Sequence, residues 1–128
     1  MFHNLDIAKL LLRLTAGIML FHGVNKLFHG IDGIKHLTVT AGLPEFFAYG
    51  VFIGEVIAPV MIIIGFYTRI GALVLAFTMA NAIYLAHASE LFTLNRHGAP
   101  SIELPLMYLL LSVAIAFAGP GKFALNRK

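Results

Sequence analysis

The group best placed to do chemistry in this chain is a carboxylate in the middle of an apolar segment. Residues 46–66 carry Glu55 as their only carboxylate and, as a helix, are long enough to cross a hydrocarbon core of about 30 Å. A carboxylate at that depth costs about 2.5–3.5 kcal/mol on insertion scales, so it normally faces a protein interior or water. We therefore expect Glu55 to have a polar partner, and His22 and Lys26, which share one helix face, are the first candidates.

Other polar side chains are expected in the same half of the membrane. They are Asn81, Tyr84 and His87 in a third apolar segment and Glu103 at the start of a fourth. Together with the three residues above, they are candidates for ligand binding or proton exchange in a cavity to which every span contributes a polar side chain. Simpler interpretations stay open. Lys26 can extend to the interface, Asn81 can bond between helices, and Glu103 can stabilise the positive end of its helix.

The composition places these residues in a membrane protein. Of 128 residues, 59% are hydrophobic and 12% are charged, and the mean hydropathy is +0.88. We predict one all-α domain over residues 1–128, an integral membrane four-helix bundle with spans at about 7–28, 46–66, 70–91 and 102–118. Apolar residues at helical spacing between the first two spans predict a short interfacial helix there, which lies in the interface or folds back over the bundle.

Small residues and a proline are expected to shape the second span. Gly50 and Gly54 lie four residues apart, which predicts a face that another helix can approach closely. Pro59 has no N–H to donate to the Glu55 carbonyl, so we expect a kink and a freed backbone acceptor at the level of the carboxylate.

The basic residues predict the orientation. Arg13 shares a face with Lys9, so both can extend toward the interface, and Arg69 lies in the tight connection before the third span. Both arginines are predicted to be structural residues. Four spans place both termini and this connection on one side, which collects six Lys and Arg residues against three on the other. Both termini are expected in the cytoplasm, with the polar layer lining a cavity open to the outside.

Several classes of function are disfavoured. The chain has no cysteine, which excludes disulfides and thiolate chemistry, and its basic residues lie at segment ends instead of forming a nucleic-acid patch. No metal-ligand spacing is present, and a bis-histidine haem between His22 and His87 has only their similar depth in its favour. No nucleophile with a base and an orienting group is found, so no catalytic residue is assigned.

A set of short motifs occurs in a fixed order along nearly the whole chain. They are Leu12-Arg13-Leu14-x-x-Gly17, His22-Gly23-x-x-Lys26, Gly42-Leu43-Pro44, Glu55, Gly65-x-x-Thr68-Arg69 and Gly119-Pro120-Gly121. This set resembles the DoxX family of small four-helix bacterial and archaeal membrane proteins. The resemblance implies a four-helix fold and, for some members, association with redox systems such as thiosulfate:quinone oxidoreductase. The closing motif of the family usually continues with a Ser and an Asp, where this chain has Ala124 and Asn126, so an acidic role there does not transfer.

Three functions fit these observations. The first is a non-catalytic, redox-associated subunit that binds a quinone-like or other small molecule. His22 or His87 would form a hydrogen bond to a carbonyl of that molecule, and Glu55 together with Lys26 would exchange protons with it. The second is a carrier of a small solute or of protons, gated near Glu55 and Pro59. The third is a structural anchor for a larger complex. A protein partner or a homo-oligomer is expected in addition to the lipid bilayer.

Overall fold

Helices are the only regular elements in the part of the chain that the structure describes. This computed structural model describes residues 2–87, 98, 102–126 and 128. In chain order the elements are α1 Phe2–Gly17, α2 Met19–His29, α3 Asp32–Thr40, the 3-10 helix η1 Glu45–Tyr49, α4 Gly50–Phe52, the π-helical turn η2 Ile53–Ile57, α5 Ala58–Ile64, α6 Thr68–His87 and α7 Glu103–Ala118.

Three segments of the described chain are long and apolar enough to cross a membrane, namely Asn4–His29, Glu45–Ile64 and Thr68–Leu85. The apolar helix α7 is shorter, at 16 residues. Large apolar side chains such as Phe21, Phe28 and Phe117 are exposed on the outside of the helices, a surface that suits a lipid bilayer. The end expected for the third span, residues 88–91, and the polar loop after it lie outside the described residues.

The first apolar rod consists of α1 and α2, with an irregular turn at Ile18. The Ile18 N–H donates to the Thr15 carbonyl, three residues earlier, with an N–O distance of 3.2 Å, so the chain tightens locally without ending the rod. Gly17 lies directly before this turn, and a Cβ at that position would overlap the side chain of Ile63 in α5. The missing side chain therefore allows α1 and α5 to approach closely.

The second rod runs through η1, α4, η2 and α5, and its middle departs from α-helical geometry. In η2 the Ala58 N–H donates to the Ile53 carbonyl, five residues earlier, and Pro59 follows in the first turn of α5. Because proline cannot donate, the Glu55 carbonyl lacks its usual α-helical partner, and the wider turn accommodates that loss. The irregularity expected at Pro59 thus takes the form of a π turn that contains Glu55.

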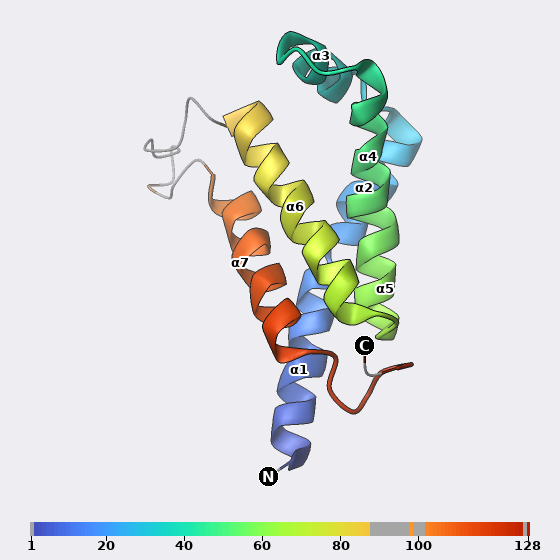
Figure 1. The fold of residues 1–128 in the computed structure, drawn as a ribbon, viewed down its shortest axis with the longest axis vertical. Coiled ribbons are helices and arrows are strands. Elements are labelled where there is room, and N and C mark those ends of the chain that lie inside the picture. Colours follow the sequence, from blue (N-terminus) through green and yellow to red (C-terminus); the bar gives the residue numbers. More distant parts are fainter. Residues whose placement is uncertain (1, 88–97, 99–101, 127) are drawn as a thin grey trace.

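The helices pack around a common core (Figure 1). α6 packs against both α5 and α7, and α1 contacts the same two helices. Small and branched side chains fill the space between them, including Ala16, Ile62, Ala72, Leu75 and Ile115, all almost completely buried. Both chain ends lie toward the end of the bundle where α5 turns into α6, which we call the terminal end. α3 lies at the opposite end, which we call the α3 end (Figure 1).

Arg13 holds the terminal end together. It is only 1% exposed, so the expectation that it extends to the interface is wrong. Its Nε and Nη2 donate to the carbonyls of Ile62 and Ile63 at 2.9 and 2.8 Å, and its Nη1 donates to those of Pro120 and Phe123 at 3.1 and 2.6 Å. One guanidinium therefore joins α1, the end of α5 and the segment after α7, where freed helix-end carbonyls need donors.

Candidate functional site

The candidate site is a cavity of about 440 Å³ at the α3 end, which we call the main cavity. Its walls come from α2, α3, the second rod and α6, and most of them are aliphatic or aromatic side chains. The polar residues that line it are Lys26, Thr38, Glu55, Thr78 and Asn81. A volume of a few hundred Å³ with few polar groups is typical of small-molecule sites.

Lys26 and Glu55 form an ion pair on the wall of this cavity. The Lys26 Nζ donates to Glu55 Oε2 at 2.6 Å, and Glu55 is only 4% exposed, while the Lys26 side chain is partly accessible. Of the two partners that the sequence suggested for Glu55, the structure places Lys26 against it. Among the hydrogen bonds of the described residues, this ion pair uses one of the three N–H donors of the Lys26 ammonium group.

Gly23 explains how Lys26 reaches the carboxylate. A Cβ at Gly23 would overlap the carbonyl oxygen and carbon of Glu55, so the two backbones touch at this point. Lys26 lies one turn further along α2, on the same side of the helix. The close approach of α2 to the π turn therefore sets the distance between ammonium and carboxylate.

Gly54 positions α6 against the π turn in a similar way. A Cβ at Gly54 would overlap the side chain of Thr78, whose hydroxyl donates to the Val74 carbonyl of its own helix at 2.9 Å. Asn81 lies one turn after Thr78 and lines the main cavity. The predicted close helix approach is thus seen at Gly54. It is not seen at Gly50, where a Cβ would meet nothing within 4 Å.

α3 covers the main cavity at its end of the bundle. Ile34, Leu37 and Thr38 line the cavity, and the Thr38 hydroxyl donates to the Ile34 carbonyl at 2.7 Å. α3 contacts both η1 and α6, so it bridges two walls of the cavity.

Lys35 links α3 to the second rod. Its Nζ lies 3.8 Å from Glu45 Oε1 and 4.9 Å from the centre of the Tyr49 ring. The side chain of Tyr49, followed by the carboxylates of Glu45 and Asp32, raises the pKa of Lys35. The exposed ammonium therefore stays charged near neutral pH and can hold this cover in place.

Not every predicted residue reaches the cavity. His22 is exposed and lies edge-on to Tyr108 of α7, with ring centroids 6.5 Å apart, while Tyr84 and Glu103 are exposed and do not line the main cavity. His87 ends α6, but its side chain lies outside the described residues. No described residue of α7 lines this cavity, so the polar layer expected from all four spans is not assembled there.

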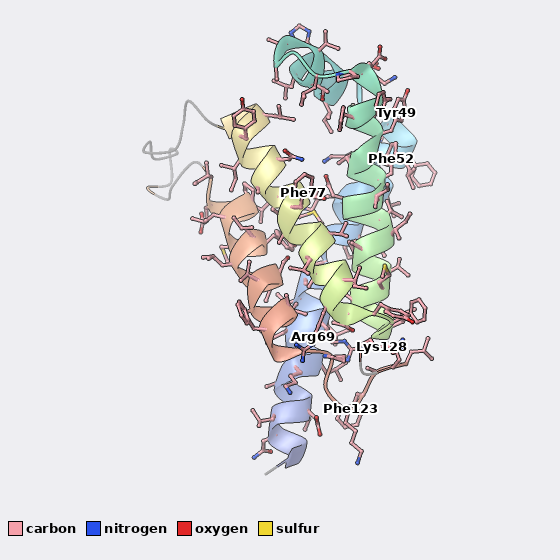
Figure 2. The ribbon with its side chains drawn as sticks, in the orientation of Figure 1. Tyr49, Phe52, Arg69, Phe77, Phe123 and Lys128 are labelled. Atoms are coloured by element: carbon pink, nitrogen blue, oxygen red, sulfur yellow. The ribbon has the colours of Figure 1, made fainter. Side chains whose placement is uncertain are left out.

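The residues predicted to be structural lie where helices turn or meet. Pro59 is buried beside the π turn, and Arg69, which is exposed, lies beside Gly119 at the terminal end. The Arg69 backbone N–H is within 3.4 Å of the Lys128 carbonyl oxygen. Figure 2 shows Arg69 and Lys128 close together at this end.

Sequence reasoning missed two threonines of the site. Thr78 and Asn81 are three residues apart and share a face, a signal that could have added Thr78 to the site. Thr38 gave no comparable signal, although it is buried under the cover. Among the described residues, no group of three or more His, Asp and Glu side chains is arranged to hold a metal ion.

Comparisons with known proteins bear on this arrangement. A family model described as DoxX matches residues 8–88. A Bacillus subtilis (strain 168) protein named "Putative oxidoreductase CatD" is 33% identical over 124 residues, which are 96% of this chain and 87% of that protein. An "Uncharacterized protein" of Haemophilus influenzae is 30% identical over 114 residues, 89% of this chain and 84% of that protein. No solved structure matches the chain.

Proposed function

Because the chain belongs to the DoxX family, we propose that it is a redox-associated membrane protein whose main cavity binds a quinone-like small molecule. The name of the Bacillus subtilis relative supports the redox association. The chain itself is proposed to be a non-catalytic subunit, so that the electrons come from a partner oxidoreductase. In this proposal the protein crosses the cytoplasmic membrane four times, with α7 as the fourth span, and α3 lies at the outer interface.

The observation that carries the proposal is the Lys26–Glu55 ion pair on the wall of an otherwise apolar cavity. Glu55 is nearly inaccessible and the ammonium bonds to it at 2.6 Å, yet Lys26 also lines the cavity and uses one of its three donors in its bonds to the described residues. A ligand carbonyl beside this ammonium would accept a hydrogen bond, and the neighbouring carboxylate would give or take a proton as the ligand changes redox state. Asn81 would provide a second polar contact from α6.

Binding can be measured directly. The purified protein in lipid nanodiscs is titrated with decylubiquinone, and Lys26→Met is compared with Lys122→Met, an exposed lysine at the terminal end. We expect Lys26→Met to weaken binding about 10-fold or more, since a hydrogen bond to a charged group contributes about 1.5–3 kcal/mol. Lys122→Met should bind like the parent protein.

The same variants separate the proposal from its alternatives. If Lys26→Met and Glu55→Gln lower stability but leave quinone affinity unchanged, the ion pair is structural and the anchor interpretation gains. If the parent protein binds no quinone but carries solute or protons across liposomes, and Glu55→Gln abolishes that flux, the carrier interpretation replaces ours.

A further inference from the structure

The main cavity reaches the lateral surface of the bundle. Ile53 of η2 and Phe77 of α6 both line it, yet they are 53% and 70% exposed. Figure 2 shows Phe77 on the side of α6 that is turned toward the second rod, whereas Tyr49 and Phe52 lie on the far side of that rod. Ile53 and Phe77 therefore flank an opening between the second rod and α6, which we call the lateral opening.

Contacts between helices limit this opening toward both ends of the bundle. On the terminal side, Gly54 and Thr78 bring η2 and α6 into direct contact. On the other side, α3 contacts η1 and α6 and places Ile34 and Leu37 over the cavity. The route along the bundle axis is thus covered by α3, while the route between Ile53 and Phe77 leads to a surface of apolar side chains.

Most of the cavity wall is apolar, and its charge is concentrated in one ion pair. Lys26 and Glu55 form this pair, with Glu55 almost fully buried. The hydroxyls of Thr38 and Thr78 donate to carbonyls of their own helices, so they contribute little polarity to the cavity. A molecule that fits this wall has a polar head at the ion pair and an apolar remainder against the aliphatic and aromatic side chains, which include Ile53 and Phe77 at the lateral opening.

We infer that the ligand enters sideways from the bilayer, through the lateral opening between Ile53 and Phe77, and that it is a lipid-soluble amphiphile. Its hydrogen-bond-accepting head lies at Lys26, and its apolar tail extends past the two flanking side chains into the lipid. The sequence predicted a polar layer that faces outward, whereas this opening leads to lipid. The ligand class rests on the proposed function, whereas the opening itself does not.

The opening can be tested without any ligand because the chain contains no tryptophan. Val51→Trp and Leu37→Trp each place a single fluorophore on the wall of the main cavity, from two different elements. The variants are reconstituted in nanodiscs and quenched either by phospholipids with brominated acyl chains or by aqueous iodide. Leu73→Trp, on the exposed face of α6, and Tyr108→Trp, in the core, serve as the lipid-facing and sealed controls.

We expect both cavity reporters to lose most of their fluorescence to brominated lipid, as Leu73→Trp does, and little to iodide. Tyr108→Trp should respond to neither quencher. Strong iodide quenching with weak bromolipid quenching at both cavity positions would overturn lateral entry. Equal protection from both quenchers would overturn it as well, since the cavity would then be sealed. Two reporters keep the test valid if one substitution prevents folding.

A pair of quinones tests the ligand class. Decylubiquinone and ubiquinone-0 share one head group, but only the former has an apolar tail. We expect decylubiquinone to bind in the main cavity. Ubiquinone-0 should bind far more weakly, even at the same free aqueous concentration. Equal affinity of the two quinones at the same free concentration would contradict the inference that the ligand is an amphiphile. If neither quinone binds while bromolipid quenching persists, the quinone-binding function fails but the lateral opening stands.

Discussion

The ion pair between Lys26 and Glu55 is a costly feature that the rest of the site supports. Two charges removed from water regain their desolvation energy only when geometry and further hydrogen bonds are good. The short N–O distance of 2.6 Å meets the first condition, and the partial exposure of the Lys26 side chain lowers the cost. A structural pair could be replaced by two apolar residues, whereas a binding pair could not be replaced without loss of the ligand.

Removing only the cation should destabilise the protein more than removing both charges. Lys26→Met leaves a nearly inaccessible carboxylate without its partner, and we expect a loss between the ~1 kcal/mol of an exposed pair and the ~3–5 kcal/mol of a fully buried one. The double variant Lys26→Met with Glu55→Gln should recover part of this loss. Thermal unfolding in detergent measures both. A double variant less stable than Lys26→Met would contradict this account.

Gly23 and Gly50 form a matched pair of glycines for testing the close contact at the π turn. A Cβ at Gly23 would overlap the backbone of Glu55, which cannot move aside like a side chain, while Gly50 faces open space. We expect Gly23→Ala to cost about 1–3 kcal/mol through overpacking. Gly50→Ala should be neutral or slightly stabilising because alanine favours helices more than glycine. Equal unfolding temperatures for the two variants would show that α2 does not touch the π turn.

At the scale of elements, one side chain of α1 joins two other segments of the chain. Arg13 donates to four carbonyls that belong to the end of α5 and to the segment after α7. Arg13→Lys keeps the charge but offers one ammonium group in place of a planar fork, so most of these bonds are lost. We expect a large loss of stability and faster tryptic cleavage after Lys122. Lys122→Arg, at an exposed lysine of the same end, is the control and should behave like the parent protein, since trypsin cleaves after either residue.

The sequence predicted helices well but not all of their local geometry. The apolar segments around Glu55 and between Thr68 and Leu85 lead directly to two long helices, since a membrane allows few other structures. Pro59 indicated an irregularity at Glu55, but a missing N–H does not by itself choose between a kink and a π turn. The π turn lies against α2 at Gly23, which is 32 residues away from Glu55 along the chain, and such a contact is not visible in one sequence.

The candidate site was predicted only in part for a similar reason. Depth in the membrane follows from sequence position, and it correctly suggested that Glu55 needs a cation. The direction in which each side chain points depends on helix rotation and crossing, which one sequence does not specify. His22 and Tyr84 have suitable depth but are exposed on other faces, while Thr78 and α3 complete the cavity.

At the scale of the whole molecule, the arrangement of the ends makes a prediction about topology. Both chain ends lie toward the terminal end (Figure 1), which by sequence position also carries most of the basic residues. We expect cytoplasmic fluorescence from green fluorescent protein fused to either terminus, and no activity from alkaline phosphatase at the same places. Phosphatase inserted after Gly42, beyond α3, should be active. Opposite results for the two termini would exclude an even number of spans.

The most direct test of the central claim is to identify what the cavity holds in its native membrane. The protein is purified in mild detergent, and the bound molecules are extracted and measured by mass spectrometry against total lipid. Val51→Phe fills the main cavity, and Val60→Phe makes the same change on an exposed position of the same rod, outside the cavity. We predict an enriched lipid-soluble carbonyl compound with the parent protein and with Val60→Phe, and its loss with Val51→Phe. No enriched compound in the parent protein, or equal amounts in both variants, would contradict a ligand-binding cavity.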